Sequence, residues 1–83
     1  MADEIEATTR KILADTVELQ TPVERIGLED NLFNLGLDSM TCMKVIVAIE
    51  AEFNFEFNDS DLHVNNFRNL QNLVSYIEKR VAL

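Results

Sequence analysis

Residues 36–53 read GLDSMTCMKVIVAIEAEF, and this stretch decides the fold. From residue 39 onward it holds neither glycine nor proline, the two residues that most often interrupt a helix. Asp38 precedes that run, where its carboxylate can accept a backbone N–H of the first helical turn. The pattern predicts a helix over residues 39–53 that begins at Ser39 and is capped by Asp38.

The predicted helix is apolar on two faces. At about 100° per residue, one face suits a core and holds Cys42, Val45, Ile46, Ile49 and Phe53. The second face, which we call the apolar arc, lies about 150° away and comprises Met40, Met43, Val47 and Ala51, flanked by Lys44. Methionine adapts to several partners, so the arc is either a docking surface or is buried under the preceding loop. Both alternatives stay open on sequence alone.

Two further helices are predicted on either side of this one. Apolar residues such as Ile12 and Leu13 recur at helical spacing within residues 3–19, and acidic residues fill the first turn. Apolar residues recur again over residues 70–81, where Asn69 is placed to cap the helix. These two helices bring the number of long helices to three.

The segment before Ser39 is predicted to be a long loop, because residues 20–38 contain the only proline and both glycines. A structureless loop of this length is uncommon in a compact domain, so we expect its leucines to pack into the core between the helices. The sequence therefore predicts an all-α fold of the four-helix bundle type, with a long loop between helices one and two and a short third helix. We expect residues 1–83 to form a single domain.

The short helix is expected between residues 54 and 69, as a turn through Leu62 capped by Asp59 or Ser60. Alternation of Phe53, Phe55 and Phe57 is typical of a strand, but a lone strand would leave its backbone groups unpaired. An extended loop is the preferred interpretation.

The composition is that of an acidic folded domain. Hydrophobic residues make up 47% of the 83 residues, a balance typical of a globular domain rather than a disordered chain. The net charge of −8 argues against nucleic acid and anionic membranes and favours basic partners. Charges interrupt every apolar stretch before the roughly 20 residues needed to cross a bilayer. Cys42 is the only cysteine and no secretion signal is present, so we expect a cytoplasmic protein.

The stretch Gly36-Leu37-Asp38-Ser39-Met40 resembles the G-x-D-S-[LM] motif of the acyl and peptidyl (aminoacyl) carrier proteins. The resemblance extends to Asp30-Asn31-Leu32-Phe33 before the motif, to Ile49-Glu50-Ala51-Glu52-Phe53 after it, and to residues 69–77. It therefore covers nearly the whole chain.

The resemblance implies that a phosphopantetheinyl transferase attaches the phosphopantetheine arm of coenzyme A to Ser39. Asp38 would then help to position a magnesium ion and the transferase. The residues themselves agree with this, because a serine at a helix start lies where unpaired N–H groups and the helix dipole favour a phosphate. An Asp-Ser pair alone is more often an ordinary cap, and the surrounding match decides in favour of the modification site.

The same resemblance implies that the chain is a carrier and not an enzyme. Acyl or aminoacyl cargo would form a thioester with the arm, loaded by a ligase and passed to a downstream synthase or transferase. Such carriers serve fatty acid, polyketide or nonribosomal-peptide biosynthesis, and no residue here reports the cargo. We expect a monomer, and a standalone protein because the chain begins with Met and ends shortly after the last predicted helix.

The predicted helix after Ser39 departs from the carriers of fatty acid synthesis, which present several carboxylates there to basic enzymes. Thr41, Lys44 and Ala51 stand where acids are common. We therefore expect partner enzymes to bind Met40, Met43 and Val47 more through apolar contact than through salt bridges, with Lys44 beside them. The rival interpretation is an unmodified helical module that docks a partner through the same arc, with Ser39 only a helix cap.

Other candidate sites carry less weight. His63 is the only histidine and has no nucleophile with an orienting acid, so we expect a surface or half-buried residue. A calcium loop starting at Asp59 is rejected, because Val64 and Leu70 occupy the positions of its glycine and glutamate. No metal site is expected, and Cys42 is expected to act as a small core hydrophobe. The acidic residues of the long loop are interpreted as a solvated surface, with steering of a basic enzyme as the alternative.

Overall fold

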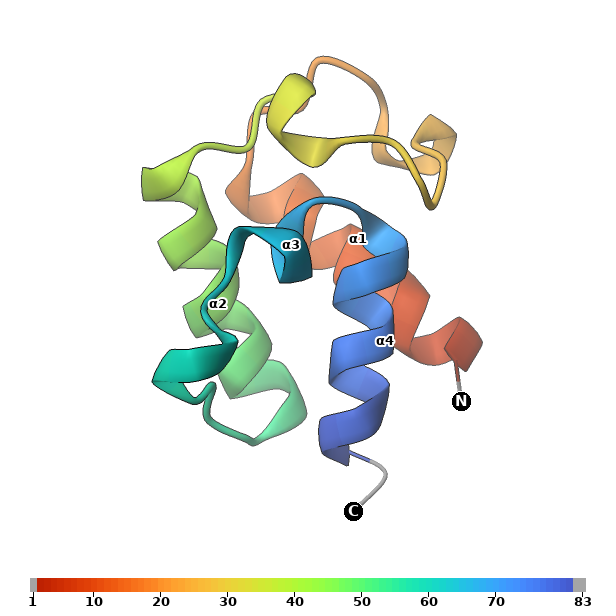
Figure 1. The fold of residues 1–83 in the computed structure, drawn as a ribbon. Coiled ribbons are helices and arrows are strands. Elements are labelled where there is room, and N and C mark those ends of the chain that lie inside the picture. Colours follow the sequence, from red (N-terminus) through yellow and green to blue (C-terminus); the bar gives the residue numbers. More distant parts are fainter. Residues whose placement is uncertain (1, 82–83) are drawn as a thin grey trace.

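The computed structural model describes residues 2–81, which fold into four α-helices and three single-turn 3-10 helices (Figure 1). The α-helices are α1 (Ala2–Thr16), α2 (Ser39–Phe53), α3 (Val64–Phe67) and α4 (Leu70–Val81). The 3-10 turns are η1 (Val23–Arg25), η2 (Leu32–Asn34) and η3 (Asp59–Asp61). Within this described range there is no strand, and no helix is both long and apolar enough to span a membrane. The all-α prediction is confirmed.

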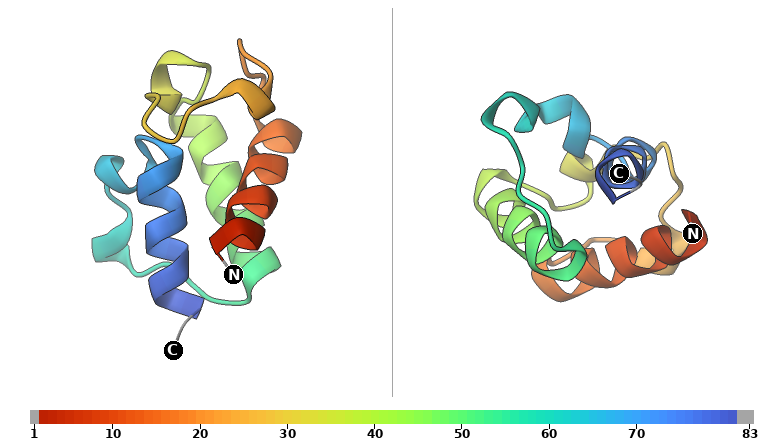
Figure 2. Two further views of the ribbon diagram at one scale, coloured as in Figure 1. Left: turned by 90° about the vertical axis from the view of Figure 1, so that its right-hand side faces the viewer. Right: turned by 90° about the horizontal axis from the view of Figure 1, so that it is seen from below.

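The three long helices enclose the core, and α1 packs against both α2 and α4. Figure 2 shows α1, α2 and α4 on three sides of a common centre. In Figure 1, α3 lies next to the start of α4, toward the long loop. The innermost side chains are fully buried and come from all three helices: Leu13, Val45, Ile49, Leu70, Leu73 and Ile77. Of the predicted core face of α2, Val45, Ile46 and Ile49 are buried. Cys42 and Phe53 are only half-buried at its edge, which corrects the expectation for these two.

The long loop is held against the helices, as predicted. Ile26, Leu32 and Leu37 are buried in the same core, whereas Leu28 remains exposed. The Arg10 guanidinium on α1 donates hydrogen bonds to two loop carbonyls, at 2.6 Å to Val23 and 2.8 Å to Ile26. The loop is therefore fixed both by apolar burial and by a charged side chain that satisfies its backbone.

The first helix ends earlier than the sequence predicts, at Thr16 instead of residue 19. The reason lies in the long loop, because the Gln20 backbone N–H donates to the Leu35 carbonyl at 2.9 Å. Gly36 lies so close that a Cβ on it would be 2.5 Å from the Glu18 carbonyl oxygen. A tertiary contact, which local helix propensity does not encode, thus ends α1.

The chain after α2 is an extended loop, as preferred over a strand. Asn54 ends α2 in the left-handed conformation, with φ 59°. Phe55 and Phe57 then pack on α4, where the Phe57 ring stacks on Tyr76 with centroids 5.0 Å apart. Arg80 on α4 donates to the Glu56 carbonyl at 2.8 Å and so ties this segment to the last turn of the helix.

The short third helix exists, but it lies further along than the sequence predicts. The turn expected through Leu62 is the 3-10 turn η3, and its N-cap is Asn58, with no capping side-chain bond, instead of Asp59 or Ser60. The α-helical turn α3 follows at Val64–Phe67, with His63 as its N-cap. Burial of Phe67 in the core fixes this helix, since its own residues are weak helix formers.

Candidate functional site

Ser39 is the first residue of α2, and the residues around it form a double cap. The Asp38 carboxylate accepts the Thr41 backbone N–H at 2.9 Å. In return, the Thr41 hydroxyl oxygen accepts the Asp38 backbone N–H, also at 2.9 Å. This reciprocal pair satisfies two donors that a helix start otherwise leaves unpaired. It confirms Asp38 as the cap of α2 and fixes where the Ser39 side chain leaves the helix.

Thr41 has a role that sequence reasoning missed. In the sequence, Thr41 stands at a position where an acidic residue was the expected alternative, whereas in the structure it is the hydrogen-bond partner of Asp38. The Thr41 backbone N–H is the main cause, and its hydroxyl the second, that lowers the pKa of Asp38 below the ordinary value of 3.8. The spacing of an aspartate and a threonine three residues later could have indicated the pair. Asp38 thus stays ionised at neutral pH beside Ser39.

Ser39 fits the attachment of a phosphate-bearing group. Its side chain is exposed, and the hydrogen bonds found among residues 2–81 engage other donors and acceptors, leaving the hydroxyl available. It stands at the N-terminus of a 15-residue helix, whose dipole favours a negative group. Its exposure among the described residues 2–81 leaves it accessible to an entering enzyme.

The apolar arc of α2 is exposed. Met40, Met43 and Val47 expose 75%, 59% and 60% of their surface, so the alternative in which the loop buries the methionines is wrong. Beside the arc, a shallow apolar groove of about 520 Å³ runs between α2 and the end of α1. Its lining consists of Thr16, Met43, Lys44, Val47, Ala48 and Ala51. Three of the four residues predicted to bind partners, Met43, Lys44 and Val47, thus line one groove, and Met40 is not part of its lining.

A second hollow opens beside Ser39, between α2 and α3. This pocket has a volume of about 250 Å³ and is mostly apolar, being lined by Phe33, Ser39, Cys42, Met43, Ile46, Leu62, His63, Val64 and Phe67. Burial raises the pKa of the Cys42 thiol, which therefore stays protonated at neutral pH. The sequence did not predict this pocket, because part of its lining comes from α3, whose position along the chain was predicted incorrectly. We call it the α2–α3 pocket.

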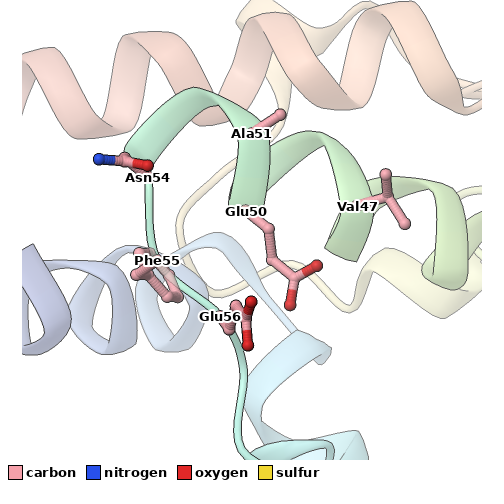
Figure 3. Close-up of a pocket in the computed structure, with 6 residues that line it drawn as sticks. All are labelled: Val47, Glu50, Ala51, Asn54, Phe55 and Glu56. Atoms are coloured by element: carbon pink, nitrogen blue, oxygen red, sulfur yellow. The ribbon is translucent and has the colours of Figure 1, made fainter.

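The far end of α2 is different in character (Figure 3). The Glu50 and Glu56 carboxylates lie near each other there, around a hollow that Val47, Ala51, Asn54 and Phe55 complete. Glu50 has a structural task, since its carboxylate accepts the Phe57 backbone N–H at 2.9 Å. Within residues 2–81 no group of three or more His, Cys, Asp or Glu side chains is placed to hold a metal ion.

Comparison with known proteins places this geometry in a family. The family model for the phosphopantetheine attachment site matches residues 7–77. The aminoacyl carrier protein of Agrobacterium fabrum is 37% identical over 65 residues, which make up 78% of this chain and 78% of that protein.

Two solved structures share the fold. One chain comes from the crystal structure of an engineered Bradyrhizobium japonicum glycine:[carrier protein] ligase complexed with a carrier protein from Agrobacterium tumefaciens and ATP. It is 32% identical with a TM-score of 0.84, covering 90% of this chain and 97% of that chain. The other, the solution structure of a holo acyl carrier protein from Nitrosomonas europaea, is 29% identical with a TM-score of 0.83, covering 96% and 98%. The chain belongs to the phosphopantetheine attachment site family of acyl and aminoacyl carrier proteins, which hold cargo for enzymes and are not themselves catalysts.

Proposed function

We propose that Ser39 is the residue that bears the phosphopantetheine arm. The observation that carries this is the exposed Ser39 hydroxyl at the N-terminus of α2, fixed by the Asp38–Thr41 double cap. A phosphodiester formed there would gain from the helix dipole, and the modification would leave the core untouched. The family match supports an arm somewhere on residues 7–77, and within that range Ser39 lies in the family-like motif.

Coenzyme A is the proposed donor, and a phosphopantetheinyl transferase the proposed catalyst. The Ser39 Oγ would attack the phosphorus atom that bears the pantetheine, and the pyrophosphate bond to the 3′,5′-ADP portion would break. The hydroxyl proton would go to a base of the transferase, and 3′,5′-ADP would leave. Asp38 uses Oδ1 for both bonds from Thr41, which leaves Oδ2 for the transferase and its magnesium ion.

The proposed cargo is an acyl or aminoacyl group held as a thioester on the terminal thiol of the arm. The similarity to an aminoacyl carrier protein and to a carrier complexed with a glycine:[carrier protein] ligase favours an amino acid loaded by an ATP-dependent ligase. A fatty or polyketide acyl group is the alternative. In either case a downstream synthase or transferase would take the cargo.

The apolar arc is the proposed docking surface for these enzymes. Met40, Met43 and Val47 are exposed beside Ser39 on one helix, and Lys44 provides the adjacent cation. Such a surface would bind through apolar contact, with charge contributing less than it does on an acidic helix face. An ionised Asp38 next to Ser39 would attract the basic surface of a transferase.

We further propose that the chain acts as one carrier domain in the cytoplasm, as a monomer. The arm can carry a thioester only when its thiol is reduced, which favours a reducing compartment such as the cytoplasm. Cys42 is the only cysteine of the chain, so the fold does not depend on an internal disulfide. α1, α2 and α4 share one core, which supports a single cooperative unit.

The decisive experiment is modification in vitro. Incubation with coenzyme A and a broad-specificity transferase should add one phosphopantetheine per chain by intact-mass spectrometry. Ser39→Ala should abolish the gain while its circular dichroism stays that of the wild type, and Ser60→Ala, on the exposed turn η3, should still accept the arm. If the wild-type mass stays unchanged, the carrier proposal is wrong and the unmodified helical module takes its place.

A further inference from the structure

The lining of the α2–α3 pocket includes one polar side chain from each of two segments of the chain. Ser39 comes from α2 and His63 from the segment that leads into α3, and the other lining residues are apolar side chains and the Cys42 thiol. An arm attached to Ser39 starts at this pocket by necessity. His63 therefore lines the same pocket from which such an arm would start.

The orientation of the His63 ring is fixed by the cap that it makes. Its Nδ1 accepts the Asn65 backbone N–H at 3.2 Å. In a neutral imidazole the nitrogen that accepts carries no proton, so the proton is on Nε2. The hydrogen bonds of the described residues provide no acceptor for Nε2, and the side chain is exposed. The ring thus combines an N–H donor that has no partner among residues 2–81 with a place in the pocket lining.

We propose that His63 donates a hydrogen bond through Nε2 to an oxygen of the phosphopantetheine arm and holds the arm back against the α2–α3 pocket. This inference rests on the proposed attachment at Ser39. The arm suits such a site, because it carries acceptor oxygens in its phosphodiester and its two amide carbonyls, together with a pair of methyl groups. The methyl groups would contact the apolar lining, where Leu62 and Val64 are exposed at the rim.

The charges around the pocket favour His63 over other partners. Asp38 adjoins Ser39 and is ionised, so it repels a phosphodiester. Asp61, on the same segment as His63, already accepts the Tyr76 hydroxyl at 2.8 Å and faces Arg80 at 3.8 Å. Lys44 lines the groove on the α1 side and is absent from the lining of the α2–α3 pocket. His63 is thus the nitrogen donor that lines the pocket.

One hydrogen bond of this kind raises the ratio of docked to free arm by about two- to tenfold. A docked arm keeps its upper part out of water and shortens the reach of its thiol. Enzymes that load or unload the carrier would have to draw the arm away from His63 before they react with it.

The test is NMR spectroscopy of the holo protein, whose modification is first established by mass spectrometry. Because His63 is the only histidine, its ring signals need no further assignment. Conversion of the apo to the holo form should shift the Nε2 resonance and produce nuclear Overhauser contacts between the ring and the methyl groups of the arm. A change in the phosphorus resonance in His63 variants would place the bond on the phosphodiester, and a change only in the arm amides would place it on a carbonyl.

Two variants separate the donor from the helix cap. His63→Ser keeps a capping oxygen for Asn65 but has no side chain that reaches the arm, so the α3 amide signals should persist while the ratio of docked to free arm falls about two- to tenfold. His63→Ala should lose both. A holo wild type without ring-to-arm contacts, or a His63→Ser protein with an equally docked arm, would overturn the inference. Neither result touches the proposed function, which fails only if Ser39 does not become modified.

Discussion

Gly36→Ala tests how the long loop sets the start of α2. Gly36 has φ +127°, a backbone conformation that residues with a side chain rarely adopt. A Cβ on it would lie 2.5 Å from the Glu18 carbonyl oxygen, closer than real Cβ atoms come. The backbone on that side cannot easily retreat, because Gln20 donates to the Leu35 carbonyl at 2.9 Å. Alanine therefore meets both strain and overlap.

The two effects set the expected magnitude. Strain outside the regions open to L-residues costs about 1–3 kcal/mol, and overpacking a tight contact costs about 1–3 kcal/mol. The lower entropy of alanine in the unfolded chain returns about 0.4–1 kcal/mol. The net loss should be about 1–5.5 kcal/mol, against roughly 4–12 kcal/mol for the unfolding of a domain of this length. A large part of the stability should disappear.

Urea denaturation followed by circular dichroism measures this loss. Gly27→Ala is the matched control, because its Cβ would meet only the Asp30 carboxylate at 3.4 Å, an ordinary contact, and its φ is not positive. Its unfolding free energy should stay within about 1 kcal/mol of the wild type. The reasoning is refuted if Gly36→Ala loses less than about 1 kcal/mol, or if both variants lose the same amount.

Three further predictions concern α2 and its neighbours. Arg80→Met removes the bonds to the Glu56 carbonyl at 2.8 Å and to the Tyr76 hydroxyl at 2.7 Å, so it should lower the unfolding free energy by about 1–2 kcal/mol. Hydrogen exchange should quicken at residues 56–62, and unchanged exchange there would contradict the role given to Arg80. Val47→Glu, at an exposed site, should change stability by less than about 0.5 kcal/mol yet weaken loading by the cognate ligase about fivefold or more. Ser75→Glu, exposed on α4, is its control, and loading at wild-type affinity by Val47→Glu would disprove apolar docking. The lowered pKa of Asp38 means that its cap stabilises α2 at neutral pH and is lost only as the pH falls through a value below 3.8. The Thr41 amide resonance should therefore titrate below pH 3.8 in the wild type and lose that titration in Asp38→Asn.

Much of the fold could be predicted from the sequence, because local and tertiary preferences agree there. Asp38 has a capping side chain and is followed by 15 residues without glycine or proline, and α2 begins and ends where expected. Asn69 is equally clear, since its Oδ1 accepts the Asn72 backbone N–H at 2.8 Å in the structure. The apolar periodicity of α1, α2 and α4 identified most of the core.

The misses have a common cause, which is that contacts distant in sequence overrule local preference. Nothing within residues 17–19 ends a helix, and α1 stops because Leu35 and Gly36 occupy the space beside it. Likewise, α3 is capped by a histidine, which is not a preferred capping residue, and is fixed by the burial of Phe67. The α2–α3 pocket depends on that helix, so periodicity could not reveal it.

The hydrogen bond from Arg80 to the Glu56 carbonyl joins residues 24 positions apart in the sequence. Through it, the last turn of α4 holds the segment around Glu56 in place. That segment continues through Asp61 to the rim of the α2–α3 pocket, and Tyr76 links Asp61 to Arg80 through two hydrogen bonds. Unwinding of this turn by a truncation, or by a bulky fusion placed after Val81, would thus be transmitted to the pocket entrance. Recombinant versions of the protein should keep the final turn intact and separate any appended partner by a flexible spacer.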